Sequence, residues 1–198
     1  MKKVIVVHGW GGNPKGDWFP WLKEKLKEDF VEVIIPEMPD TLHPTIDAWL
    51  SPLADAADDI DEDTILIGHS IGCQTILRFV EKLPGNTKVG GIILVAAWLH
   101  LTDETWDEEY TKEIAKPWLE TPINFEKIKN HTKNIVCIQS EDDPYVPVAD
   151  AQIFEEKLGA KIIFLKNAGH IAAEDSITKL PEILEQINNL SNKLNQEY

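Results

Sequence analysis

Residues 64–80 read TILIGHSIGCQTILRFV, and this stretch decides the fold. Its first four residues are apolar and mostly β-branched, which predicts a buried strand. Its second half spaces apolar side chains as one buried helix face requires. The pattern Gly68-x-Ser70-x-Gly72 lies between the two. Because so short a turn strains its middle residue and holds the hydroxyl beside a helix N-terminus, we expect a nucleophile elbow at Ser70.

Short apolar runs recur along the whole chain and alternate with amphipathic segments. This alternation predicts an α/β fold with a mainly parallel central sheet and helices on both faces. We expect one domain over residues 1–198. The predicted strands are 4–7, 31–35, 64–67, 90–96, 134–139 and 161–165, and the predicted helices are 17–29, 45–60, 71 to about 84, 125–129, 148–158 and 177–194.

Two further polar positions follow predicted strands in the manner of Ser70. They are the pair Asp142 and Asp143, and His170. Their order along the chain, serine then acid then histidine, is the order used by hydrolases of this topology. A serine hydroxyl is a weak nucleophile that needs a histidine base, and an acid fixes the tautomer of that base. We favour Asp143 over Asp142 because it directly precedes Pro144.

A tetrahedral intermediate needs two N–H donors for its oxyanion. One comes from the residue after the nucleophile, here Ile71, and the other from the loop after the first strand, where Trp10 is best placed. That loop is rich in glycine, but it lacks both the P-loop and the dinucleotide-binding patterns. Around the substrate we expect five further residues, although the histidines among them could be structural: His8, Gly9, His69, Trp98 and Trp118.

Periodicity is lost over residues 98–118, where aromatic side chains stand among acidic ones. The segment is too long for a plain connection. We interpret it as a small cap over the site, and the alternative is a surface excursion whose aromatics pack on the core.

The chain is acidic, with a formal net charge of −15 over 198 residues. Such a surface repels phosphate backbones, so nucleic acid and anionic membranes are not expected partners. No signal peptide or membrane-spanning run is present, and we expect a cytoplasmic protein. Cys73 and Cys137 are expected to be small buried hydrophobes rather than a disulfide. No metal-ligand pattern occurs, so neither a metal nor a cofactor is expected.

Several motifs together resemble one family of small serine hydrolases, those similar to retinoblastoma-binding protein 9 within the α/β-hydrolase superfamily. They are HGWGG at 8–12, the helix around Trp21, PEMPD at 36–40, GHSIG at 68–72, DDPYVP at 142–147 and GH at 169–170. The resemblance implies a compact α/β-hydrolase fold with little or no cap, and a triad of Ser70, Asp143 and His170. The L-x-C-x-E motif that binds retinoblastoma protein is absent, so a protein partner stays unknown.

These features predict a carboxylesterase-like serine hydrolase that acts through an acyl-enzyme on Ser70. Small, largely apolar carboxylic esters are the expected substrates, with thioesters and small amides as further candidates. Two alternatives keep the same residues: a binding or scaffold protein without turnover, and an acyltransferase.

Overall fold

A central sheet of six parallel strands forms the core of the structure, a computed structural model that describes residues 3–27, 32–105 and 109–194. The strand order is β2-β1-β3-β4-β5-β6, and every neighbouring pair is parallel. The strands are β1 Lys3–Val7, β2 Glu32–Ile34, β3 Thr64–His69, β4 Gly91–Val95, β5 Ile135–Ser140 and β6 Lys161–Leu165.

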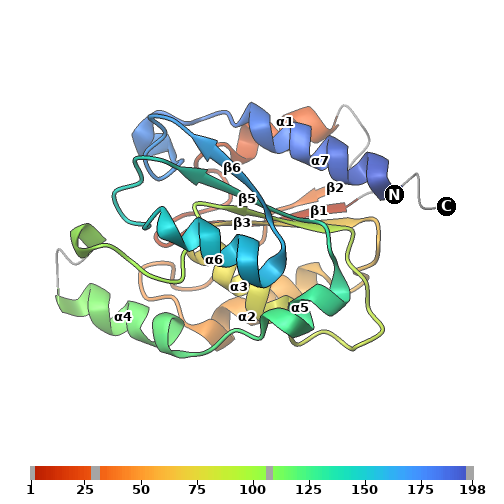
Figure 1. The fold of residues 1–198 in the computed structure, drawn as a ribbon, viewed down its shortest axis with the longest axis horizontal. Coiled ribbons are helices and arrows are strands. Elements are labelled where there is room, and N and C mark those ends of the chain that lie inside the picture. The colour runs from red at the N-terminus through yellow and green to blue at the C-terminus, as the bar shows by residue number, and fades with distance from the viewer. Residues whose placement is uncertain (1–2, 28–31, 106–108, 195–198) are drawn as a thin grey trace.

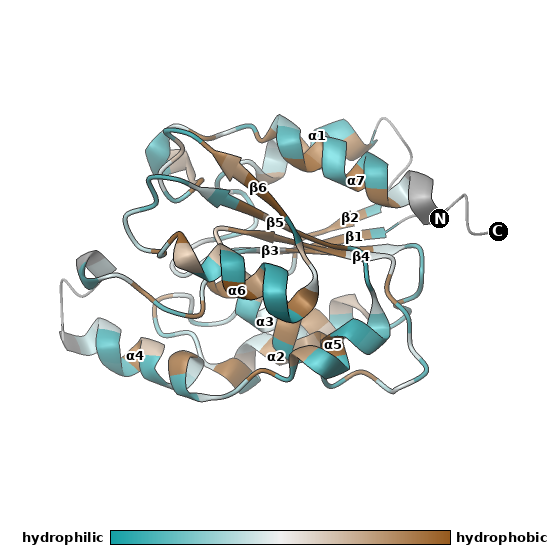
Figure 2. Ribbon diagram, in the orientation of Figure 1, coloured by the Kyte–Doolittle hydropathy of each residue, from teal (hydrophilic) through white to brown (hydrophobic). Residues whose placement is uncertain are grey.

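Helices cover both faces of this sheet (Figure 1). One face packs against α1 Phe19–Lys27 and α7 Pro181–Leu194. The other face packs against α2 Ile46–Ala56, α3 Ile71–Val80, α5 Phe125–His131 and α6 Ala149–Leu158. Figure 2 shows the apolar strands enclosed between helices whose outer sides are polar. This arrangement confirms the predicted fold class of a mainly parallel sheet between two helical layers.

Element boundaries differ from the sequence prediction mainly at helix ends. The second helix stops at Ala56 although we expected it to reach 60, and it tolerates Pro52. The last helix starts at Pro181 rather than 177. Proline suits the first helical position because its missing N–H would have no partner there. The expected strand at 31–35 is shorter, and its first residue lies outside the described part of the chain.

The segment 98–118 holds a short helical turn, η1 Asp103–Thr105, and most of α4 Glu109–Glu120. Its end residues Trp98 and Trp118 are buried in the core. The Nη2 of Arg78 on α3 donates to the carbonyl oxygens of Trp118 and Thr121 at 2.9 and 2.8 Å. The buried guanidinium therefore fixes the C-terminal end of α4 to the helix that follows Ser70.

The turn between β3 and α3 brings backbone segments into close contact. A β-carbon at Gly72 would lie 2.3 Å from the carbonyl oxygen of Val7 and 2.7 Å from that of His8. One at Gly68 would lie 2.5 Å from the Cα of Cys73. Both glycines are therefore required by the contact of the elbow with β1 and α3.

We expect Gly72→Ala to lower the free energy of unfolding by about 3 kcal/mol or more, because the added methyl meets rigid backbone rather than a movable side chain. Gly85→Ala is the matched control, since a β-carbon there meets nothing within 4 Å. It should change stability by less than about 0.5 kcal/mol. Urea denaturation followed by circular dichroism measures both. Equal stability of the two variants would contradict the proposed close packing.

Candidate active site

Ser70 occupies the predicted strand-to-helix turn. It caps the N-terminus of α3 with φ 53° and ψ −123°, a conformation that non-glycine residues rarely adopt. Its backbone N–H donates to the carbonyl oxygen of Val95 at 2.9 Å, which ties the turn to β4. The strained backbone is thus held by the sheet, as is common where strain serves a site.

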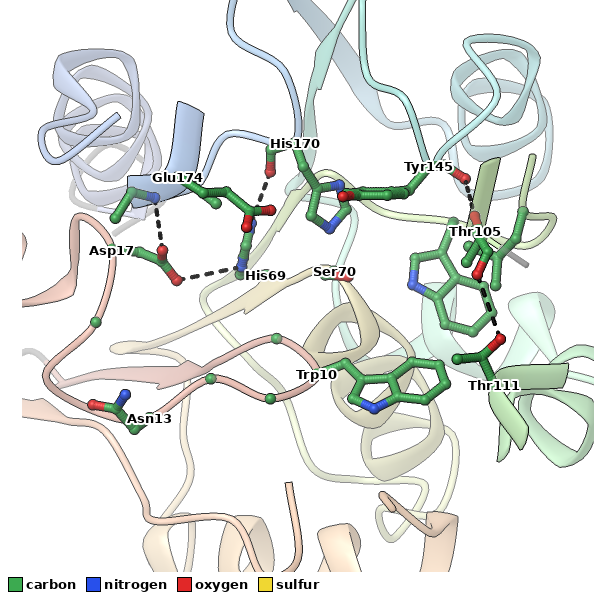
Figure 3. A pocket seen from close by; sticks show the side chains of 18 residues that line it. Trp10, Asn13, Asp17, His69, Ser70, Thr105, Thr111, Tyr145, His170 and Glu174 are labelled. Carbon is green, nitrogen blue, oxygen red and sulfur yellow. Dashed lines mark hydrogen bonds and ion pairs between the residues drawn. The ribbon is translucent and has the colours of Figure 1, made fainter. Parts of the chain in front are cut away.

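His170 and Asp143 form a close pair. The Nδ1 of His170 lies 2.8 Å from Oδ2 of Asp143, and both side chains are largely buried. The other carboxylate oxygen, Oδ1, accepts from the backbone N–H groups of Tyr145 and Val146 at 2.9 and 3.0 Å. Because an ionised carboxylate only accepts, Nδ1 carries the proton and Nε2 is left as an acceptor. Figure 3 shows this imidazole directed toward Ser70.

Asp142 has a different set of partners. Its Oδ1 accepts from the hydroxyl of Ser140 at 2.7 Å and from the backbone N–H of Ala168 at 3.0 Å. The Ser140 hydrogen bond, followed by backbone N–H groups, lowers the pKa of Asp142 below its usual value. Asp142 therefore ties the end of β5 to the loop before His170, while Asp143 contacts the imidazole itself.

The loop that carries His170 is strained and tightly bonded. Gly169 has φ 52°, and a β-carbon there would lie 2.1 Å from Oδ1 of Asp175. The Oδ2 of Asp175 accepts from the backbone N–H of His170 at 2.8 Å. Ile171 has φ 58°, which is unfavourable for a β-branched side chain, and its carbonyl accepts from the indole of Trp18 at 3.2 Å. These bonds hold the base in one place.

The two backbone N–H groups that we expected at the oxyanion site belong to Ile71 and Trp10. Among the described residues, neither the N–H of Ile71 nor that of Trp10 donates a hydrogen bond. The loop with Trp10 is shaped by other bonds: Gly12 donates to the carbonyl of Gly9 at 3.1 Å, and the indole of Trp10 donates to the carbonyl of Leu42 at 2.9 Å. The loop can therefore offer an N–H without losing a bond of its own.

These residues meet at a pocket of about 480 Å³ (Figure 3). It is lined by Gly9, Trp10, Gly11, Gly12, Asn13, Gly16, Asp17, His69, Ser70, Trp98, Leu101, Thr105, Thr111, Tyr145, His170, Ala172, Ala173 and Glu174. Of the residues that we expected around the substrate, Gly9, His69 and Trp98 are in this wall.

His8 and Trp118, also expected there, do not line the pocket. The ring of His8 is buried edge-on against Trp49, with Nδ1 2.9 Å from the carbonyl of Gly9. Burial lowers the pKa of His8. The indole of Trp118 packs on Trp49 and donates to the carbonyl of Pro44 at 3.0 Å. Both side chains pack in the core behind the pocket wall, because burial of their rings in the apolar core was favoured over a place in the pocket.

Sequence reasoning missed most of the pocket rim. Asp17 belongs to no motif that the sequence shows, and its position at the pocket depends on its left-handed backbone, with φ 48°. Glu174 belongs to a short helical turn, η2 Ala173–Asp175. No periodic spacing of apolar residues predicts this turn. Tyr145 is the exception that could have been found, because it lies within the motif around Asp143 and its ring centroid is 5.2 Å from that of His170.

Among the described residues that line the pocket there are carboxylates but no lysine or arginine. Asp17 and Glu174 stand on one side of Ser70 and Tyr145 on the other (Figure 3). Trp98 and Leu101 add apolar side chains to the wall. Within residues 3–27, 32–105 and 109–194, no three side chains of the metal-binding types are grouped to hold an ion. Among these residues, too, no helix has the length and apolar character to cross a bilayer.

A parallel sheet with a serine elbow and an acid–histidine pair at its carboxyl edge defines the class of α/β hydrolases. The chain matches the serine hydrolase family over residues 4–189 and belongs to that family. It is 30% identical to YdeN of Bacillus subtilis over 192 residues, 97% of each chain. It is also 30% identical to the serine hydrolase RBBP9 of Rattus norvegicus over 171 residues, 85% of this chain and 86% of the other. The predicted family is thereby confirmed.

Solved structures agree with this fold. The crystal structure of the ydeN gene product superposes with a TM-score of 0.87 at 29% identity, covering 97% of this chain and all of the other. Est1E of Butyrivibrio proteoclasticus, solved with ferulic acid bound, gives a TM-score of 0.69 at 16% identity over 95% of this chain and 90% of the other. The second likeness is one of fold alone.

Both cysteines are free and buried, as expected. Burial raises the pKa of the Cys73 and Cys137 thiols well above the ordinary value. Since a raised pKa keeps a thiol protonated, neither should be nucleophilic at pH 8. We expect iodoacetamide to leave the native protein unmodified at pH 8 and to alkylate both cysteines in urea. Mass spectrometry checks this, and rapid alkylation of the native protein would contradict it.

Proposed function

We propose that this serine hydrolase cleaves small carboxylic esters through an acyl-enzyme on Ser70. The observation that carries the proposal is the 2.8 Å bond from Nδ1 of His170 to Asp143, with the other edge of the ring facing Ser70 in one pocket. A neutral imidazole held in this tautomer is a general base for a serine hydroxyl. Thioesters and small amides are further substrates open to the same chemistry.

The reaction follows from these positions. The Ser70 hydroxyl attacks the ester carbonyl while Nε2 of His170 takes its proton, and Asp143 stabilises the imidazolium. The N–H groups of Ile71 and Trp10 bind the oxyanion. Collapse of the intermediate expels the alcohol, which takes the proton from His170. Water then attacks the acyl-enzyme with His170 again as base, which releases the acid and restores Ser70.

The pocket suggests the kind of ester. A volume of about 480 Å³ and the side chains of Trp98, Leu101 and Tyr145 suit a short acyl or aryl group. The carboxylates of Asp17 and Glu174 disfavour an anionic substrate, and no cation among the described lining residues offsets them. We therefore propose small uncharged esters.

Turnover of p-nitrophenyl acetate tests the triad. We expect Ser70→Ala to lower kcat by roughly 10⁴ to 10⁶. Asp143→Asn should lower it by about 10⁴, because the amide no longer fixes the tautomer of His170. Asp142→Asn is the matched control. Its amide oxygen can still accept both of its bonds, so we expect a loss of less than about tenfold.

Three results would overturn this assignment. Hydrolysis by Ser70→Ala at the wild-type rate would remove Ser70 from the chemistry. A folded wild-type protein whose rate equals that of buffer would favour the scaffold alternative. If acyl transfer to an added alcohol exceeded hydrolysis, the acyltransferase alternative would be favoured instead.

A panel of p-nitrophenyl esters tests the pocket. We expect kcat/KM to peak at acyl chains of about two to four carbons, because the pocket of about 480 Å³ must hold the alcohol group as well as the acyl group. Diethyl succinate should be hydrolysed at least about tenfold faster than monoethyl succinate, since the second carries a carboxylate into an acidic site. A preference for long chains, or for the anionic ester, would contradict the proposed substrate.

A further inference from the structure

We propose that His69 is a positioning residue, which holds the base His170 in register with the nucleophile by a hydrogen bond between their two backbone segments. The inference rests on the proposed function of Ser70 and His170. His69 precedes Ser70 directly and is the last residue of β3. Its side chain leads away from the elbow to the loop that carries the base (Figure 3).

This hydrogen bond determines which nitrogen of the His69 ring carries the proton. Its Nε2 lies 3.0 Å from the backbone carbonyl oxygen of His170. A carbonyl oxygen can only accept, so Nε2 must carry a proton and act as the donor. The residue before the nucleophile is thereby bonded to the very residue that supplies the base.

No other bond does the same work. Among the described residues, no hydrogen bond joins the Ser70 side chain to His170 directly. The other bonds to this loop come from elsewhere: Asp142 and Asp143 after β5, Asp175 within the loop, Trp18 beside α1, and Asp17, whose Oδ1 accepts from Ala173 at 2.8 Å. Of the bonds between described residues, only that of His69 connects the loop to β3. It is therefore the direct link between the strand that leads to the nucleophile and the loop that carries the base.

The His69 ring is also held rigidly. It is 3% exposed and packs edge-on against Trp18 and Phe19, with centroid distances of 6.2 and 6.1 Å. Its centroid lies 5.3 Å from that of His170. A buried, fully packed ring loses little freedom when its bond forms, so it transmits the position of the strand to the loop.

The ring is neutral when the enzyme works. Burial first, and then the charge of His170, lower the pKa of His69 to about 4, while Asp17 and Asp143 act in the opposite direction. Its Nδ1 finds no hydrogen-bond partner among the residues that the structure describes, and it lies 3.9 Å from Oδ2 of Asp17. A second positive charge beside His170 would oppose its uptake of the serine proton. A neutral His69 ring donates its hydrogen bond to the His170 carbonyl without this electrostatic repulsion.

Three substitutions of His69 distinguish a positioning role from a general contribution to packing. Gln places an N–H near the position of Nε2, Asn places one nearer to Nδ1, and Leu offers bulk without a donor. With p-nitrophenyl acetate, we expect kcat to fall by about 10- to 100-fold in His69→Leu and His69→Asn. His69→Gln should stay within about threefold of wild type. KM should change by less than about twofold in all three, because the bond does not hold the substrate.

Trp18→Phe is the control for a loosened loop. It removes the bond to Ile171 but leaves the link to β3 intact, so it should lower the free energy of unfolding and reduce kcat less than His69→Leu does. The pH profile of kcat/KM for His69→Gln should match that of wild type, because His69 titrates below the working range.

The proposal is overturned if His69→Leu retains wild-type kcat, or if His69→Gln is impaired as much as His69→Asn. The second comparison remains valid should Leu prevent folding, because Gln and Asn are similar polar residues. Loss of the proposed function gives a different result. In that case the hydrolysis rate of Ser70→Ala would equal that of wild type. If only the positioning role fails, hydrolysis still depends on Ser70 but does not change when His69 is substituted.

Discussion

The left-handed backbone of Ser70 is the constraint on which the site depends. Ser70, at φ 53°, joins α3 directly to β3, which is paired with β1 on one side and β4 on the other. Gly72 permits the contact with β1, and the bond to Val95 fixes the turn to β4. Strain of this kind costs of the order of 1–3 kcal/mol, which the surrounding sheet must supply. In return the hydroxyl projects from the carboxyl edge, where the other loops meet.

The parallel order of the strands brings the remaining groups to the same edge. Asp143 follows β5 and His170 follows β6, so the pair forms from neighbouring strands, and β4 separates them from the strand of Ser70. The sheet alone cannot fix a separation across that intervening strand. Loop bonds must do so, which is why the His170 loop is strained at Ile171 and bonded on several sides.

Much of this architecture could be predicted from the sequence, because buried parallel strands are short apolar runs and the elbow has its own pattern. Asp143, which we favoured because of its proline neighbour, lies 2.8 Å from the imidazole of His170. Prediction failed where tertiary packing decides. Trp118 looked like a pocket residue, yet its indole is in the core. Asp17 reaches the pocket through a left-handed turn, and Glu174 through a single helical turn, and neither has a periodic signal.

The central claim is that Ser70 is an activated nucleophile, and covalent labelling tests it most directly. The folded protein should be treated with a fluorophosphonate probe and its peptides analysed by mass spectrometry. The account predicts one adduct, on Ser70, that is absent from Ser70→Ala and forms much more slowly in His170→Ala. No adduct on the folded wild-type protein, or equal labelling of Ser70→Ala, would contradict it.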